Sequence, residues 1–187
     1  MRKLGVFNLM TLDGYITGER GDISWHEAVF VNGEFQKYAE RNSNAGGTLL
    51  FGRKTYELMA GYWPTAEALK NDPIVAGGMN AATKIVFSRT LKKAGWSNTR
   101  LVKSGLLAEV RRLKAGSGKG LTILGSGSLV SQLAPAGLID EYQLMVVPVA
   151  LGRGKTMFEG LKKRLKLKLK STKAFRNGSV LLVYSKA

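Results

Sequence analysis

The chain has 187 residues, no cysteine and one histidine, His26, which excludes disulfides, thiolate metal sites and histidine-rich metal sites. Its 29 lysine and arginine residues outnumber 13 aspartate and glutamate residues, so the formal net charge is +16 and anions such as phosphorylated cofactors or nucleic acid should be attracted. No stretch is long and apolar enough for a membrane span or a signal peptide, so we expect one cytoplasmic domain over residues 1–187.

The amino-terminal quarter predicts a strand, a long loop and a helix. An apolar run over residues 3–10 predicts a central strand, which is followed by a turn at residues 13–14. Glycine and polar residues continue as far as residues 25–26, so we expect a long loop over a sheet edge, a kind of segment that often carries function. Helical spacing from Glu34 to Asn42 then predicts a helix.

A cationic junction between a strand and a helix comes next. A short buried strand over residues 48–51 leads directly into the helix start at Gly52, Arg53, Lys54 and Thr55. Cations at a helix start oppose the helix dipole, which is favourable if an anion lies between them and the exposed N–H groups. The alternative interpretation is two solvated surface cations.

A third strand end also carries a cation and hydroxyl groups. Helix and loop precede it, and we expect breaks at Pro73 and at residues 77–78. An apolar strand over residues 84–88 follows, and Arg89 and Thr90 stand at its end. This is therefore a further candidate for contact with an anion.

The middle of the chain continues the alternation of strands and helices. Residues 101–102 predict a short strand, and Ser104 predicts the cap of a helix that ends before a flexible connector at residues 116–120. Another strand and helix occupy residues 121–137. This order favours an α/β fold with a mostly parallel sheet.

Residues 121–124 pass through a glycine turn into a helix, with Gly125, Ser126 and Gly127 in the turn and Ser128 as the predicted N-cap. The unpaired N–H groups of the helix start would point at the turn and make a place for phosphate. The alternative is a tight turn that binds no ligand.

The carboxyl third predicts antiparallel strands added to the same sheet. Residues 139–147 form a long apolar strand, and leucine and lysine alternate over residues 165–170. The Asn-Gly pair at residues 177–178 predicts a type I′ hairpin. Lysines on an edge strand oppose aggregation, and nucleic-acid binding by this lysine-rich run is the alternative.

Taken together, five segments in this order resemble the dihydrofolate reductase-like fold, most closely its branch with the reductase domain of bacterial riboflavin biosynthesis. The matching segments are residues 11–16, 49–57, 85–91, 124–129 and 139–154. The resemblance implies a three-layer α/β fold with a central, mostly parallel sheet, antiparallel carboxyl-terminal strands and helices on both faces. It also implies that NADPH lies across the carboxyl edge of the sheet, and that the protein is a homodimer.

The resemblance assigns roles to individual residues. Cofactor phosphates would be held by Gly52, Arg53, Lys54, Thr55, Gly125, Ser126, Gly127, Ser128 and Leu129. The adenosine 2′-phosphate, which distinguishes NADPH from NADH, would be held by Ser88 and Arg89, with Thr90 also in the cofactor set. The substrate would pack near Trp25, Phe35 and Tyr38.

The loop over residues 13–25 would close over the nicotinamide and exclude water. Asp13 keeps the family pattern and is the catalytic candidate, while a role in forming the Asp-Gly turn is the alternative.

The implied activity is an NADPH-dependent reductase, similar to 5-amino-6-(5-phosphoribosylamino)uracil reductase or dihydrofolate reductase. It would transfer a hydride to a small heterocyclic substrate, pteridine-like or ribosylaminopyrimidine-like, or to a carbonyl or imine. A catalytically silent nucleotide-binding protein and a basic nucleic-acid-binding module are the alternatives. We expect no metal and no membrane partner.

Overall fold

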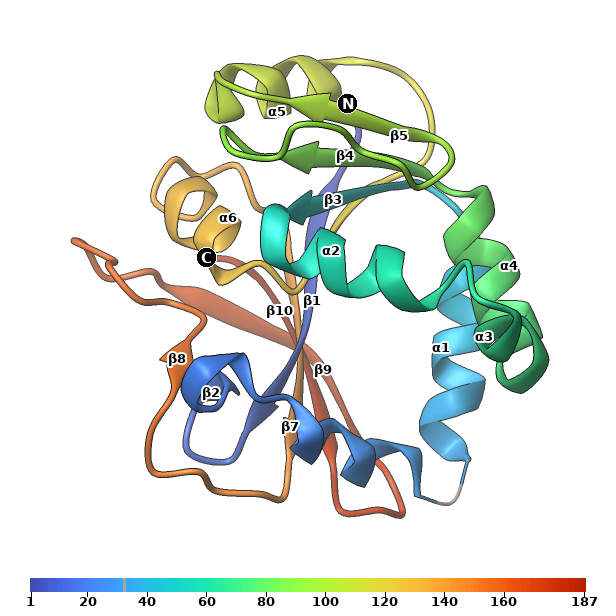
Figure 1. Ribbon diagram of the computed structural model, residues 1–187. Helices are drawn as coiled ribbons and strands as arrows, with labels where there is room; N and C mark the ends of the chain where they lie inside the picture. The colour runs from blue at the N-terminus through green and yellow to red at the C-terminus, as the bar shows by residue number, and fades with distance from the viewer. Residues whose placement is uncertain (32) are drawn as a thin grey trace.

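The computed structural model describes residues 1–31 and 33–187, whose strands and helices are drawn in Figure 1. The strands are β1 (Leu4–Thr11), β2 (Tyr15–Thr17), β3 (Thr48–Gly52), β4 (Thr83–Phe87), β5 (Thr99–Val102), β6 (Leu121–Leu124), β7 (Glu141–Val147), β8 (Lys155–Thr156), β9 (Leu167–Ala174) and β10 (Val180–Lys186). The α-helices are α1 (Glu34–Ala45), α2 (Arg53–Tyr62), α3 (Ala66–Asn71), α4 (Pro73–Ala81), α5 (Leu106–Ala115) and α6 (Gly127–Leu133). Two 3₁₀ helices, η1 (Glu19–Gly21) and η2 (Ser24–Phe30), lie in the predicted loop.

One sheet of eight strands forms the centre of the fold, in the order β5-β4-β3-β6-β1-β7-β10-β9. Strands β1 and β3 to β7 run parallel to one another, whereas β10 is antiparallel to both of its neighbours, β7 and β9. Figure 1 shows β5 and β4 at one end of the sheet and the β9–β10 hairpin at the other. The predicted fold class is confirmed, including the antiparallel carboxyl-terminal strands.

Helices cover both faces of this sheet because its strands carry apolar side chains on both sides. Phe51 of β3 and Met145 of β7 belong to clusters buried under α1, α2 and α4. Their strand neighbours Leu50 and Leu144 point the opposite way, into a cluster closed by α5 and α6. Because β1 and β3 to β7 run in the same direction, their carboxyl ends lie at one edge of the sheet, where the loops that follow them meet.

The predicted break at residues 77–78 is wrong, because both glycines lie inside α4. Pro73 is the first residue of that helix, a position where its missing N–H costs nothing. A Cβ atom on Gly78 would stand 2.8 Å from the Ser43 Cβ of α1. Gly78 therefore allows α4 to pack closely on α1, whereas a Cβ on Gly77 would meet nothing within 4 Å.

Two predicted helix caps are also wrong. The N-cap of α5 is Gly105, in the left-handed conformation, and Ser104 lies outside the helix. The N-cap of α6 is Ser126, also left-handed, which puts Ser128 inside the helix. In both places a positive φ angle, and no side-chain cap, sets the start of the helix.

The carboxyl-terminal hairpin forms where it was predicted, but with a different turn. Phe175 and Ser179 close the loop through a 2.8 Å backbone bond, and only Gly178 has a positive φ angle. A type I′ turn would need positive φ at Asn177 as well. The three-residue loop is therefore a turn followed by a left-handed glycine.

Strand β9 is the edge of the sheet, as the lysine pattern predicts, and its residues are almost all exposed. Unlike the exposed lysines of β9, Lys84 of β4 has a fully buried side chain. Its amine donates to the carbonyls of Met79 and Ala82, both at 2.7 Å, at the end of α4. No helix within residues 1–31 and 33–187 is long and apolar enough to cross a membrane.

Candidate functional site

Three junctions meet at the carboxyl edge of the parallel strands. The backbone register pairs Gly52 of β3 with Phe87 of β4, so the residues that follow these strands leave the sheet side by side. On its other side, β3 pairs with β6, the strand that leads into the glycine turn. The structure therefore brings together segments that the sequence placed at residues 52–55, 88–90 and 125–128.

Two of these junctions are joined by direct hydrogen bonds. The amide of Gly52 donates to Ser126 Oγ at 2.7 Å, and Ser126 Oγ donates to Thr55 Oγ1 at 3.0 Å. Ser126 adopts a left-handed conformation with φ of 56°, which is uncommon for a residue with a side chain. Its hydroxyl thus compensates for strained backbone by fixing the β3–α2 junction against the glycine turn.

The glycines of this corner are surrounded so closely that a side chain would displace neighbouring groups. A Cβ atom on Gly125 would stand 3.1 Å from Thr55 Cγ2, and one on Gly52 would stand 3.3 Å from the hydroxyls of Ser126 and Ser128. The amides of Gly127 and Ser128 donate to no backbone acceptor among the described residues. Bare backbone with free N–H groups is the surface that a phosphate needs. Helix α6 has only two turns, so it would bind an anion through these amides and not through a long helix dipole.

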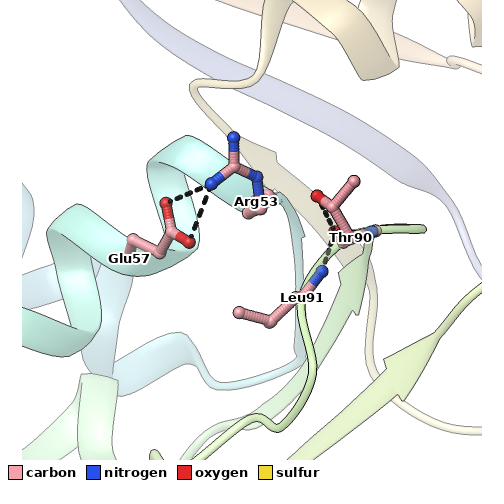
Figure 2. Close-up of polar contacts among 5 residues, drawn as sticks. Arg53, Glu57, Thr90 and Leu91 are labelled. Atoms are coloured by element: carbon pink, nitrogen blue, oxygen red, sulfur yellow. Dashed lines mark hydrogen bonds and ion pairs between the residues drawn. The ribbon is translucent and has the colours of Figure 1, made fainter.

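The cations of the site lie at its solvent-facing side. Arg53 and Lys54 are the first residues of α2, and both are exposed. Arg53 forms an ion pair with Glu57, one turn along the helix, at 3.1 Å (Figure 2). Arg89 is exposed at the end of β4 and makes no ion pair within the described part of the chain. Because these side chains are exposed, they can turn toward an anion with no loss of core packing.

The loop after β4 is ordered by one hydroxyl group. Ser88 Oγ accepts hydrogen bonds from the amides of Thr90, at 3.1 Å, and Leu91, at 2.9 Å. Figure 2 shows this loop beside the first turn of α2, with the guanidinium of Arg53 between Glu57 and Thr90 in the view. Because Ser88 accepts in both bonds, its own O–H proton can still donate to a phosphate, as the predicted contact requires.

Both carboxylate oxygens of Asp13 accept hydrogen bonds from the protein. Oδ1 accepts a 2.6 Å bond from Thr11 Oγ1, and Oδ2 accepts the amides of Leu151 and Gly152 at 2.9 and 2.7 Å. The Thr11 hydroxyl, and then the Gly152 amide, lower the pKa of Asp13 below its ordinary value. An ionised, fully bonded carboxylate favours the turn-forming alternative, and the catalytic role stays a prediction.

The predicted loop contains a short two-stranded ribbon. Strand β2 pairs with β8, which connects residues 15–17 to the segment after β7. From β2, the Ile16 side chain lies over the glycine turn, where a Cβ on Gly127 would stand 2.9 Å from Ile16 Cδ1. The loop therefore already covers the turn that is the candidate phosphate site.

Leu129, a member of the predicted cofactor set, has little free surface. The Leu129 side chain is buried in the core beneath α6, and its amide donates to the Ser126 carbonyl at 2.8 Å. These contacts disfavour a ligand contact by Leu129, which stays a prediction.

The three predicted substrate residues share one aromatic cluster on the sheet face covered by α1. Trp25 and Phe35 are each only 7% exposed. The Tyr38 ring packs 6.1 Å from that of Phe35, and its hydroxyl donates to Gln143 Oε1 at 2.8 Å. These rings mainly build the core under the loop, and substrate contact by them stays a prediction.

The chain is similar to known proteins over nearly its whole length. The family model of the RibD C-terminal domain matches residues 2–181. The chain belongs to the RibD C-terminal domain family.

Relatives from this family have similar lengths. The uncharacterised protein YyaP of Bacillus subtilis (strain 168) is 33% identical over 175 residues, which covers 94% of this chain and 90% of the relative. The uncharacterised protein YwjB of the same organism is 29% identical, with coverage of 93% and 92%.

Solved structures share the fold. A protein from Shewanella sp. PV-4 named for riboflavin biosynthesis has a TM-score of 0.74 and 22% identity, over 99% of both chains. A diaminohydroxyphosphoribosylaminopyrimidine deaminase/5-amino-6-(5-phosphoribosylamino)uracil reductase from Thermotoga maritima has a TM-score of 0.68 and 17% identity. This match covers 100% of the present chain and 57% of that one.

Within this RibD C-terminal domain, sequence reasoning missed three residues around the site. Asn8 is a buried polar residue of β1 whose amide donates to the Gly125 carbonyl at 3.5 Å, and a lone asparagine in an apolar run was its signal. Glu57 could have been found from its i,i+4 spacing to Arg53. Ile16 had no signal, since an apolar residue in a loop gives no hint of what it covers. No group of three or more potential metal ligands occurs among the described residues.

Proposed function

We propose that this protein is an NADPH-dependent reductase that transfers a hydride to a small heterocyclic, carbonyl or imine substrate. One observation carries the proposal, namely the convergence of the β3–α2, β4 and β6–α6 junctions on one edge, joined by the Gly52–Ser126 hydrogen bond. Free amides, hydroxyls and exposed cations from three distant segments are what an extended phosphorylated dinucleotide requires.

The residues present fit such a cofactor. The glycine turn at Gly125 and Gly127 packs against Thr55 and Ile16, and the backbone amides at the start of α6 would suit the pyrophosphate. Arg53, Lys54 and Thr55 would bind phosphate at the start of α2, while Ser88, Arg89 and Thr90 would hold the 2′-phosphate. When bound, NADPH supplies the hydride.

The chain's own residues would orient the cofactor and exclude water. Ile16, held over the glycine turn by the β2–β8 ribbon, would cover the pyrophosphate, while the loop over residues 13–25 would exclude water from the nicotinamide. The proton would come from water or a nearby side chain. The substrate would lie near the Trp25, Phe35 and Tyr38 cluster, below the same loop.

Support for a ribosylaminopyrimidine-like or pteridine-like substrate comes from the family. The Thermotoga maritima protein of the same fold is named as a 5-amino-6-(5-phosphoribosylamino)uracil reductase. A compound of that kind combines a flat heterocycle, which suits the aromatic rings, with a phosphate, which suits the exposed cations.

Titration with NADPH and NADH, followed by fluorescence, tests the cofactor, and a panel of heterocyclic and carbonyl compounds tests turnover. We expect NADPH to bind more tightly than NADH and to be oxidised with at least one compound. Binding without oxidation across the panel would favour a silent nucleotide-binding protein. A lack of dinucleotide binding, together with a steep salt dependence on DNA or RNA, would favour a nucleic-acid module.

We also propose that the protein is a homodimer, as members of the dihydrofolate reductase-like fold led us to expect. Light scattering coupled to size-exclusion chromatography measures this directly. A mass near 20.3 kDa at micromolar concentration would contradict it.

A further inference from the structure

Arg53 is held by one acidic neighbour at the mouth of the candidate cofactor site. Its Nη1 atom lies 3.1 Å and 3.3 Å from the two carboxylate oxygens of Glu57. Both side chains are close to half exposed, at 43% and 45%. The Nε and Nη2 atoms of Arg53 have no hydrogen-bond partner among the residues that the structure describes. One edge of the guanidinium is therefore free for an anion.

The free edge is next to the loop that follows β4. The pairing of Gly52 with Phe87 makes Arg53 a lateral neighbour of that loop, and Figure 2 shows Thr90 on the side of Arg53 away from Glu57. A 2′-phosphate held by Ser88, Arg89 and Thr90 in this loop would face Nε and Nη2 of Arg53, and would lie across a single guanidinium group from the Glu57 carboxylate, at roughly 6–7 Å. Glu57 would thus act on the phosphate through space.

Two effects of Glu57 then oppose each other. By fixing the arginine, an exposed i,i+4 ion pair favours binding by about twofold at most. By its charge, the carboxylate repels a phosphate dianion well inside the Debye length of about 8 Å, which weakens binding by about 3–10-fold. The repulsion is the larger effect.

From this geometry we infer that Glu57 sets the preference between 2′-phosphorylated and unphosphorylated dinucleotides, by opposing a 2′-phosphate that the loop after β4 holds beside Arg53. The inference rests on the proposed function. It makes Glu57 a specificity-determining residue that does not itself contact the reacting atoms.

The test compares dissociation constants for NADPH and NADH in the wild-type protein, in Glu57→Gln and in Glu67→Gln. Glutamine keeps the length of Glu57 and can still accept a hydrogen bond from Arg53, so the substitution removes charge more than position. Glu67 is the matched control, because it is an exposed glutamate of α3 that forms no ion pair within the described residues. Melting temperatures of the variants verify that each is folded.

We expect Glu57→Gln to tighten NADPH by about 3–10-fold and NADH by less than twofold, with no effect of Glu67→Gln. The gain should shrink towards nothing at 1 M salt, where the Debye length is about 3 Å. Weaker NADPH binding, or equal gains for both dinucleotides, would overturn the role of Glu57 while leaving the reductase proposal standing. Absence of binding of either dinucleotide by the wild-type protein would overturn both.

Discussion

The amide of Gly52 donates a 2.7 Å hydrogen bond to the hydroxyl of Ser126, a residue 74 positions later in the chain. This bond ties the start of α2 to the glycine turn before α6. Both partners belong to the candidate cofactor site, so the site is held together by a contact within itself. Its integrity can therefore be tested apart from ligand binding.

Ser126→Ala should lower the free energy of unfolding by about 1–2 kcal/mol, because the buried Gly52 amide loses its acceptor. NADPH affinity should fall as well, since the two junctions are no longer joined. Ser128→Ala is the control for stability alone, because the Ser128 side chain is exposed in the first turn of α6. Denaturant titration measures both variants. Equal, small effects would mean that the Ser126 hydroxyl does not organise the corner.

Arg89→Ala should weaken NADPH binding by roughly 1.5–3 kcal/mol, the value of a charge-assisted hydrogen bond to the 2′-phosphate, and leave NADH nearly unchanged. Arg111→Ala, on the exposed surface of α5, removes the same charge far from the site and controls for the overall field. Calorimetric titration distinguishes the two. A similar loss for NADPH and NADH would show that Arg89 has another role.

Asp13→Asn should lower the melting temperature by a few degrees, because an amide cannot accept all the hydrogen bonds that Thr11, Leu151 and Gly152 donate. Thr11→Val should give a similar loss through the same turn. If Asp13 only shapes the turn, turnover falls in step with stability in both variants. A loss of turnover confined to Asp13→Asn, at unchanged melting temperature, would instead support the catalytic prediction.

Gly154→Ala should detach the loop from the segment after β7. A Cβ atom at Gly154, whose φ is 151°, would clash with the Thr17 carbonyl of β2. We expect trypsin to cut at Arg20 several-fold faster in this variant. Gly152→Ala has a positive φ of 73° but open space for its Cβ, so it controls for backbone strain alone. Equal digestion of the two variants would contradict a role for the ribbon.

His26 should make stability depend on pH in a defined window. Burial lowers the pKa of His26 to about 4, and the charge of Asp22 opposes this only in part. Above pH 6.5 the imidazole is neutral in both states, whereas between pH 6.5 and 4 only the unfolded chain binds the proton. Stability contributed by His26 is therefore lost as the pH falls through this range, by up to about 3 kcal/mol.

The variant His26→Gln should show a flatter stability curve between pH 6.5 and 4 than the wild-type protein, measured by urea denaturation at several pH values. Carboxylates with lowered pKa, such as Glu109 at about 2, titrate mostly below this window. Identical curves for the two proteins would mean that His26 is accessible to water.

Residue patterns predict this fold well where periodicity is strong. The central strands, the hairpin and the exposed edge all follow from apolar runs and alternation over residues such as 3–10 and 165–170. The Gly77-Gly78 pair suggested a break, whereas Gly78 serves the close packing of α4 on Ser43, a contact between distant segments. The hydrogen bond from the Lys84 amine to the Met79 carbonyl of α4 likewise cannot be predicted from local sequence patterns.

The candidate site was predictable as three strand ends, but not as a bonded unit. Glycines, cations and hydroxyls at residues 52–55 and 125–128 pointed to phosphate from local rules alone. The link through Ser126, the cover provided by Ile16 and the bonds of Asp13 each depend on the approach of a second segment. Such relationships lie in the tertiary structure, which a single sequence does not display.

Strand β9, an edge strand of the sheet, has consequences for handling the protein in the laboratory. Its free backbone groups could pair with a strand of another molecule. Repulsion between the lysines at Lys166, Lys168 and Lys170 keeps two such edges from pairing. That protection is electrostatic, so concentrated salt or chemical acylation of the amines weakens it. Purified stocks should accordingly stay clear in dilute buffer and turn cloudy after acetylation.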